Sequence, residues 1–312
     1  LGGQVKLDRE RAWNAMKDQI ADPLGLTVEE AAAGVIELLD AELRDYLRSM
    51  ISGKGYSPSS FTCFSYGGAG PVHTYGYTEG LGFEDVIVPA WAAGFSAFGC
   101  AAADFEYRYD KSLDINIPED APDEEKASEA KLLDDAWQEL AQRVLDEFAV
   151  NGYSADQVTL TPGYRMQYRG QLNDLEIESP IQTAGKPDDW DKLVAAFNDT
   201  YGRVYAESAR SPELGYSVTG AIMRGTVPIP KPKIPKEEEG SPTPPEEARL
   251  GTRQFYRHGK WVEAQLYQME TLTPGNRITG PAIIESDATT FVVPGGFETH
   301  LDGHRLFHLK EV

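Results

Sequence analysis

The sequence predicts an α/β unit, an α+β domain and a small β module, in that order along the chain. Short apolar runs alternate with helix patterns over residues 1–117, whereas residues 118–226 combine two amphipathic helix patterns with alternating strand patterns. Residues 227–250 contain seven prolines and form an expected linker, and residues 251–312 contain short strand patterns separated by turn signals. A chain of 312 residues is long enough for such separate cores.

The first unit opens with two helix patterns. Residues 8–20 consist largely of helix formers. Thr27 is followed three residues later by Glu30, which is the spacing of a capping box and predicts the start of a second helix. We expect that helix to end near Gly53 or Gly55.

Two short apolar runs in the first unit are typical of buried strands. Residues 61–66 and 85–89 are each bounded by turn residues, and residues 71–79 between them are predicted to be helical. Residues 94–103 are dense in Gly, Ala and Ser, so their backbone is expected to approach a neighbour closely. Residues 104–117 alternate like a strand and complete the predicted unit.

The α+β domain is predicted from two helix patterns and two strand patterns. Apolar residues between positions 123 and 150 recur at helical spacing beneath an acidic face, and residues 190–201 repeat this pattern. Residues 158–178 and 217–227 alternate in strand fashion. The proline-rich segment that follows is expected to be extended, either as a linker or as a strap on the surface.

Composition argues against several partners. The 29 Lys and Arg residues are outnumbered by 50 Asp and Glu residues, and the net charge of −21 repels polyanions, so no nucleic acid is expected. No apolar run reaches the roughly eighteen residues of a membrane helix. We therefore expect no membrane association and a cytoplasmic location. Cys63 and Cys100 lie in apolar stretches and are predicted to be buried free thiols.

The strongest candidate site is a glycine-rich turn between a predicted strand and a predicted helix. Gly67, Gly68 and Gly70 follow the apolar run, and Pro71 stands in the first turn of the helix. Glycine has no Cβ, so a ligand can touch the main chain while the positive helix end faces it. This favours an anion or a nucleoside, although tight packing of a helix on a sheet produces the same pattern.

Five segments resemble one enzyme family. Residues 66–73 read Tyr-Gly-Gly-Ala-Gly-Pro-Val-His and resemble the Gly-Gly-Ala-Gly-Pro-Leu-His signature of hydantoinase A-type subunits. Segments similar to other blocks of that family follow in the same order at residues 81–89, 96–104, 168–171 and 280–285. The chain is thereby identified as similar to the C-terminal half of the nucleotide-binding subunit of the hydantoinase A, 5-oxoprolinase and acetone (or acetophenone) carboxylase superfamily.

The resemblance implies an actin-like, ribonuclease H-like lobe over residues 1–117, bound to ATP and Mg²⁺. It implies nucleotide contacts from five residues of the turn and the helix after it, namely Gly67, Gly68, Ala69, Gly70 and His73. A purely structural role for His73 at the helix start stays open. The family's phosphate-binding Gly-Thr hairpin is absent from this sequence, so an N-terminal half or companion chain is expected to complete the nucleotide site.

Other candidates have plainer alternatives. Asp104, with Asp110 nearby in sequence, is a candidate for holding Mg²⁺, although a strand often carries such charges in solvent. Arg169 and Gln171 are two residues apart and are candidates for facing a substrate or partner, or form an ordinary hairpin edge. A final set recurs every four residues but is expected on strands rather than at a metal: His300, His304 and His308.

The family resemblance favours a subunit of an ATP-dependent enzyme that phosphorylates a small carbonyl substrate, not active alone, with a hydantoinase B-type catalytic subunit as partner. Residues 80–83 and 98–105 look closer to ketone carboxylases than to hydantoinases, which favours an acetone- or acetophenone-type carboxylase. A ring-amide hydrolase is the alternative within the superfamily. A non-catalytic assembly module, with the turn as packing, is the alternative outside catalysis. No catalytic residues can be assigned from the sequence.

Overall fold

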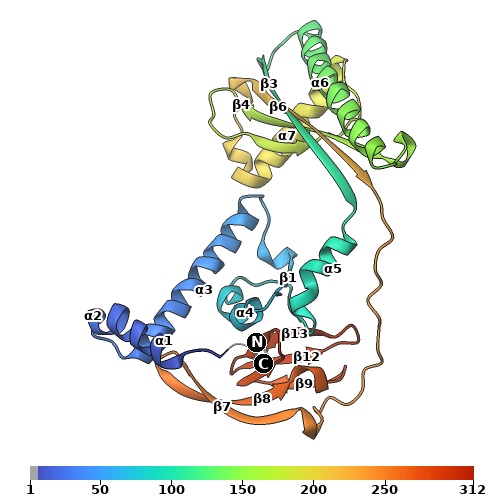
Figure 1. Cartoon of the computed structure of the whole chain (residues 1–312). Helices are drawn as coiled ribbons and strands as arrows, with labels where there is room; N and C mark the ends of the chain where they lie inside the picture. The colour runs from blue at the N-terminus through green and yellow to red at the C-terminus, as the bar shows by residue number, and fades with distance from the viewer. Residues whose placement is uncertain (1–5) are drawn as a thin grey trace. The chain divides into compact units, whose positions relative to one another are not determined.

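The computed structural model describes residues 6–312 and folds them into two compact units (Figure 1). The first unit comprises the described residues up to 52 together with 57–101 and 232–312, and the second comprises 53–56 and 102–231. Each unit has its own cluster of buried apolar side chains. The chain therefore leaves the first unit, builds the second and returns, which differs from the expected series of consecutive domains.

The first unit begins with helices in the two regions where the sequence predicts them, after residue 8 and after Thr27. These are α1 (Arg9–Met16), the π-helical turn η1 (Lys17–Ala21), α2 (Asp22–Leu24) and α3 (Val28–Ser52). The Thr27 backbone N–H donates to Glu30 Oε2 at 2.8 Å, and the Glu30 N–H donates to Thr27 Oγ1 at 3.2 Å. This confirms the capping box, and α3 ends directly before Gly53 as expected.

A five-stranded sheet combines two strands from residues 62–89 with three strands from residues 277–311. Its order is β1 (Thr62–Phe64), β2 (Asp85–Pro89), β13 (Leu306–Glu311), β12 (Phe297–Leu301) and β9 (Arg277–Thr279). β1 and β2 are parallel and are connected by α4 (Gly70–Thr78). β13 pairs antiparallel with β2, from Leu306 opposite Pro89 to His308 opposite Ile87. The expected strands and helix of this region are thus present.

A second sheet packs with the first around one core. Its order is β11 (Thr290–Val293), β10 (Ala282–Glu285), β8 (Lys260–Gln268) and β7 (Arg249–Arg257). Val88 of β2 is fully buried in the same cluster as Phe291 of β11 and Phe307 of β13. Residues 251–312 are therefore not a separate β module, because their strands extend the N-terminal sheet and share its core.

The proline-rich segment has no helix or strand from residue 228 to residue 245. Its second half lies against the first unit: the Glu237 N–H donates to the Gly303 carbonyl at 2.8 Å, and the Gly240 N–H donates to the Pro274 carbonyl at 2.8 Å. Of the two expectations, the surface strap describes residues 237–243 better than a free linker.

The second unit is a four-stranded antiparallel sheet with two long helices. The strand order is β3 (Phe105–Ile117), β6 (Tyr216–Val227), β4 (Thr159–Tyr168) and β5 (Leu175–Glu178), and the helices are α6 (Asp123–Val150) and α7 (Pro187–Tyr205). β3 pairs with β6 along nearly its whole length. The expected boundary at residue 117 is therefore wrong, because β3 belongs to this sheet and not to the first unit.

Helices α6 and α7 contribute to one apolar core with the sheet of the second unit. The Trp137 indole N–H donates to the Gly163 carbonyl at 2.7 Å, and the Tyr164 hydroxyl donates to the Leu193 carbonyl at 2.6 Å. Both aromatic side chains are fully buried, so these bonds satisfy polar groups that would otherwise be costly to bury.

Several smaller elements complete the description. The short 3-10 helices are η2 (Pro58–Ser60), η3 (Ala92–Gly94), η4 (Ala155–Gln157), η5 (Glu207–Ala209), η6 (Pro212–Leu214), η7 (Glu246–Ala248) and η8 (Met269–Thr271). Residues 95–102 form the helix α5 (Phe95–Ala102). A Cβ at Gly94 or Gly99 would meet no atom within 4 Å, so the expected close backbone approach is absent at these two described positions.

The two cysteines differ from the expected buried pair. Cys100 on α5 is exposed, and Cys63 on β1 is half-buried. Burial raises the pKa of the Cys63 thiol to about 11. Over the described residues, no helix combines the length and apolar character needed to cross a bilayer.

Gly225 on β6 is required by the packing of α6. A Cβ at this position would lie 2.3 Å from Val144 Cγ1, so we expect Gly225→Ala to lower the free energy of unfolding by about 1–3 kcal/mol. Denaturant unfolding measures the change. Gly220→Ala on the same strand, where the nearest atom is the Lys111 carbonyl oxygen at 3.3 Å, is the control and should cost less. Equal stability of the two variants would contradict this packing.

The thiols should differ in reactivity toward iodoacetamide. With a pKa of about 11, Cys63 is ionised in about one molecule in a thousand at pH 8, whereas Cys100 is exposed. We expect mass spectrometry to find Cys100 alkylated first, and the rate at Cys63 to rise about tenfold per pH unit below its pKa. Similar rates at both thiols in the folded chain at pH 8 would contradict the burial of Cys63, and denatured chain serves as the control.

Candidate functional site

The glycine-rich turn lies directly after β1 and is hydrogen-bonded to β2 and to η3, which follows β2. The Ser65 N–H donates to the Ile87 carbonyl at 2.8 Å, and the Gly67 N–H donates to the Ala92 carbonyl at 2.9 Å. Gly67 has a φ of +87°, a conformation that other residues rarely adopt. The backbone of the turn itself therefore needs this glycine, whether or not a ligand binds.

A threonine in the turn between β10 and β11 contacts the glycine turn. The hydroxyl of the buried Thr289 donates to the Gly67 carbonyl at 2.9 Å and lies 3.3 Å from the Gly68 carbonyl. A Cβ at Gly68 would lie 3.3 Å from the Ala288 carbonyl oxygen, which is a tight contact. Packing thus explains part of the requirement for Gly68, and sequence reasoning missed Thr289 as a contact of the turn.

The start of α4 has no side-chain cap. Ala69 occupies the N-cap position without a side-chain hydrogen bond to the helix, and Pro71 follows within the first turn. The first amides of a helix carry partial positive charge, but here Pro71 has no N–H and the Val72 N–H donates to the Ala69 carbonyl at 3.1 Å. A Cβ at Gly70 would meet Ser65 Oγ at 3.5 Å, an ordinary contact, so packing does not require this glycine.

His73 in the first turns of α4 pairs with a carboxylate that sequence reasoning did not select. Its Nδ1 donates to Asp40 Oδ1 at 2.8 Å, and 16% and 13% of the two side chains are exposed. Asp40 lies on α3, and a Cβ at Gly76 would fall 1.9 Å from its Oδ2. Since the carboxylate engages Nδ1, Nε2 is the ring nitrogen left for another partner.

A second polar contact joins the same two helices. The Arg44 guanidinium, one turn beyond Asp40 on α3, donates to the Gly76 carbonyl at 2.8 and 3.2 Å. It also lies 3.6 Å from Glu79. On the sequence alone, Asp40 and Arg44 have the spacing of solvated helix charges. The glycine inside α4 was the available signal that another helix approaches there.

A cavity of about 540 Å³ opens within the first unit, beside α1, α3, α4 and the β7–β8 hairpin. Its lining is mostly aromatic and apolar and includes Trp13, Ile36 and Trp261. The Arg257 guanidinium, also in the lining, lies 4.4 Å from the Tyr75 ring centroid. The cavity borders the side of α4 that carries Tyr75 and Gly76, and the glycine turn is not part of its lining.

Asp104 and Asp110, the proposed metal carboxylates, are both occupied by cations in the second unit. Asp104 forms an ion pair with Lys231, which lowers its pKa together with the Ile229 N–H at 3.2 Å. Partial burial acts to raise the pKa of Asp110, but its contacts with Arg108 and Arg165 lower it overall. Among residues 6–312, no three His, Cys, Asp or Glu side chains cluster closely enough to hold a metal ion. The Mg²⁺ role of Asp104 stays a prediction.

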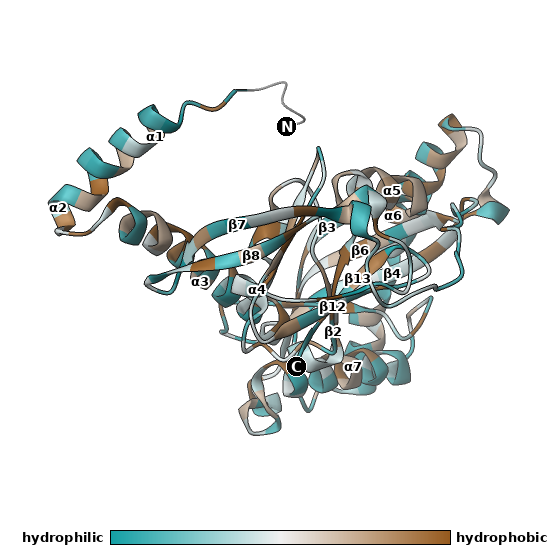
Figure 2. Ribbon diagram, turned by 90° about the horizontal axis from the view of Figure 1, so that it is seen from below, coloured by the Kyte–Doolittle hydropathy of each residue, from teal (hydrophilic) through white to brown (hydrophobic). Residues whose placement is uncertain are grey.

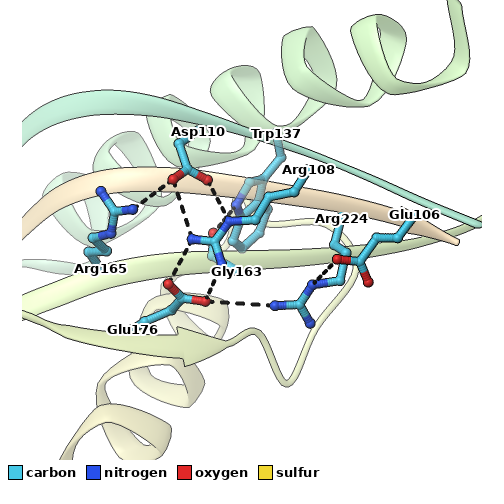
Figure 3. Close-up of polar contacts among 8 residues, drawn as sticks. All are labelled: Glu106, Arg108, Asp110, Trp137, Gly163, Arg165, Glu176 and Arg224. Carbon is cyan, nitrogen blue, oxygen red and sulfur yellow. Dashed lines mark hydrogen bonds and ion pairs between the residues drawn. The ribbon is translucent and has the colours of Figure 1, made fainter. Parts of the chain in front are cut away.

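Figure 3 shows that Asp110 belongs to a ladder of charges on the sheet of the second unit. Arg108 bridges Asp110 at 3.0 Å and Glu176 at 2.7 Å, and hydrogen bonds to these carboxylates raise its pKa. Arg165 lies 2.7 Å from Asp110, and Arg224 lies 3.6 Å from Glu106. Because each arginine of the ladder faces a carboxylate, this face presents no uncommitted anion site among the residues drawn.

The remaining candidates have structural partners. His300 and His308 face each other across β12 and β13, and their partners are Glu239 at 3.0 Å and Asp85 at 2.6 Å. His304 Nδ1 donates to the Pro235 carbonyl at 3.2 Å, so the three histidines do not converge.

Residues 169 and 171 sit in the turn after β4. The Gln171 side-chain amide donates to the Tyr201 hydroxyl at 2.7 Å, and the Arg169 N–H donates to the Gly215 carbonyl at 3.0 Å. These contacts favour the hairpin-edge interpretation over a substrate contact.

Two family models match the chain. The model described as "Hydantoinase/oxoprolinase" matches residues 1–109, and the "Hydantoinase/oxoprolinase C-terminal domain" model matches residues 120–312. Together they cover both the turn and the strands that hold it.

Curated relatives align along the whole chain. The acetone carboxylase beta subunit of Xanthobacter autotrophicus is 78% identical over 312 residues, and the acetophenone carboxylase gamma subunit of Aromatoleum aromaticum is 30% identical over 316 residues. The caprolactamase subunit alpha of Pseudomonas jessenii is 26% identical. The chain covers 44%, 42% and 43% of these relatives, so it spans less than half of their length.

Two solved structures are similar. A nucleotide-free acetone carboxylase, from work on ATP-dependent acetone carboxylation, is 78% identical with a TM-score of 0.69 over 99% of this chain and 44% of that one. The ATP-dependent caprolactamase of Pseudomonas jessenii is 24% identical with a TM-score of 0.80 over 100% of this chain and 44% of that one. The second likeness shows the mixed α/β fold alone.

The Asp40–His73 pair should contribute to the stability of the first unit. We expect Asp40→Ala to lower the free energy of unfolding by about 1–3 kcal/mol, because it leaves His73 Nδ1 without its acceptor. A double-mutant cycle with His73→Ala measures the coupling. Asp45→Ala on the same helix, with a side chain 77% exposed, is the control. A coupling energy near zero would show that the contact does not stabilise the fold.

Proposed function

Because the chain belongs to the hydantoinase/oxoprolinase family, we propose that it is part of an ATP-dependent enzyme that activates a carbonyl group by phosphorylation. The reaction proposed first is that of an acetone- or acetophenone-type ketone carboxylase. One observation carries this proposal: the glycine turn leads into an uncapped helix start, in a chain 78% identical throughout to an acetone carboxylase subunit.

The proposed nucleotide site is the edge of the sheet at which β1 ends. In the proposed actin-like lobe, the strand, the glycine turn and the helix start would direct main-chain amides of the turn and the positive end of α4 toward an anion. Gly67 through Gly70 would lie against the phosphate or nucleoside, and His73 would offer Nε2 while Asp40 holds Nδ1. Mg²⁺ bound with ATP would need ligands other than Asp104 alone, whose carboxylate is engaged by Lys231.

The chemistry consists of one phosphoryl transfer. An enolate oxygen of a small ketone attacks the terminal phosphorus of ATP, the bond to the bridging oxygen breaks and ADP leaves. The resulting phosphate ester supplies a good leaving group for a step in a hydantoinase B-type partner subunit. The proposal also includes an N-terminal half or companion chain that completes the nucleotide site.

Ring-amide hydrolysis is the second candidate reaction. Its support is the 26% identity with the caprolactamase subunit, which extends over 99% of the chain. The same phosphoryl transfer to an amide oxygen would serve it. Activation of ATP hydrolysis by a ketone rather than by a lactam separates the two reactions.

The alternative is an assembly role without catalysis, and the packing contacts of Gly67 and Gly68 are the observations that support it. Gly68→Val is a poor test between the two roles, because the Ala288 carbonyl already lies 3.3 Å from the position of a Cβ. Gly70 is more informative, since its Cβ would make an ordinary contact with the protein at 3.5 Å.

In the assembled enzyme we expect Gly70→Ala to lower ketone-stimulated ATP hydrolysis about 100-fold, since a misplaced phosphate costs roughly this factor. Its melting temperature and assembly should match those of the wild-type enzyme. Gly34→Ala, at an open helical position on α3, is the matched control. A Gly70→Ala enzyme that assembles, melts normally and retains ATP turnover would contradict the nucleotide site.

A further inference from the structure

Helix α3 carries an exposed apolar stripe. Of its 25 residues, Ala31 and Asp40 are buried. Five large apolar residues with exposed fractions of 37–65% recur at spacings of three and four, namely Val35, Leu39, Leu43, Tyr46 and Met50. At about 100° per residue they fall within an arc of roughly 80°. Hydrophobic residues run through α3 in Figure 2, and a stripe of this kind normally faces a core or a partner.

The strand that follows α3 has an open edge. β1 is the terminal strand of its sheet and pairs with β2 on one side. On that side the Ser65 N–H reaches the Ile87 carbonyl, and the Phe61 carbonyl receives the Glu84 N–H. Because backbone groups alternate along a strand, those of Thr62 and Phe64 point toward the open edge. A parallel strand at an uncovered edge is unusual in a folded α/β protein.

The topology indicates what should lie at this edge. α4 connects β1 to β2, and α3 packs beside α4 through the Asp40–His73 and Arg44–Gly76 contacts. In a parallel sheet built from right-handed β–α–β units, helices on the same face connect strands that follow one another in one direction across the sheet. The strand that α3 connects to β1 should therefore lie next to β1, on the side opposite β2. The apolar stripe is centred about a third of a turn from the side of α3 that contacts α4, so it faces away from α4 and is free to pack on such an extended sheet.

We propose that the α3 stripe and the open edge of β1, together the α3–β1 surface, dock the part of the family's longer chain that this sequence does not include, and that this part supplies a strand parallel to β1. We choose this docking partner because the relatives are longer than this chain. Nearly all of this chain aligns to each relative, but it covers 44% of the acetone carboxylase beta subunit and 44% of the caprolactamase chain. The inference deepens the proposed function, because it gives the companion segment a defined seat.

Amide hydrogen exchange tests the docking. This chain is mixed with a polypeptide that contains the remaining part of the Xanthobacter autotrophicus acetone carboxylase beta subunit. We expect the Thr62 and Phe64 amides to exchange at least tenfold more slowly in the complex. The Ser65 amide, already bonded to Ile87, should change little and is the internal reference. A complex in which the Thr62 and Phe64 amides still exchange rapidly would overturn the pairing.

Substitutions test the stripe separately. Leu43→Asp should weaken the complex about 30-fold or more, as expected for a central buried contact. Leu38→Asp on the same helix is the matched control, since Leu38 is 62% exposed but lies outside the stripe. Equal effects of the two changes would overturn the proposal. So would a dimer of this chain alone that protects Thr62 and Phe64 and resists the added segment. Docking without ATP binding would contradict the proposed function and leave the α3–β1 surface intact.

Discussion

The first unit depends on the pairing of β13 with β2. Through it, residues 306–308 bond to residues 87–89, and Val88 becomes fully buried against the C-terminal strands. β1 is joined to the rest of the sheet by β2, and Thr289, directly before β11 of the second sheet, reaches the glycine turn from the shared core. The Thr289 hydroxyl bonds the Gly67 carbonyl at 2.9 Å, so the C-terminal half of the chain also holds the turn. The candidate site is therefore made by both ends of the described chain.

The α3–α4 contact has a different physical character. A buried carboxylate is costly unless it is paired, and Asp40 meets this condition through His73. Gly76 makes the geometry possible, because any side chain there would occupy the space of the Asp40 carboxylate. Arg44 then satisfies the Gly76 carbonyl from the same helix. His73 is thus a structural residue through Nδ1, and only Nε2 is available to the proposed nucleotide.

Local features could be predicted from the sequence, whereas distant pairings could not. Helix α3 and its capping box follow from a few neighbouring residues, as does the turn at Gly67. The transfer of β3 to the second unit depends on a register with β6 about a hundred residues away, which no local period reveals. The same holds for Asp104, whose partner Lys231 is 127 residues distant and changes a metal candidate into half of an ion pair. No local pattern marks Asp40, because its partner lies on another helix.

Charge links the docking surface to the proposed site. The chain has a net charge of −21, and residues 64–73 contain no Lys or Arg. The start of α4 supplies about half a positive charge, which is small against a triphosphate. Arg44 is committed to Gly76 and Glu79 and cannot readily supply more. A strand parallel to β1 would bring its own C-terminal loop to the sheet edge where Gly67 lies, since parallel strands end on the same side. If that strand docks on the α3–β1 surface, its C-terminal loop can supply positive charge beside the glycine turn, and the strand itself covers the open edge of β1. Assembly is then a condition for tight nucleotide binding.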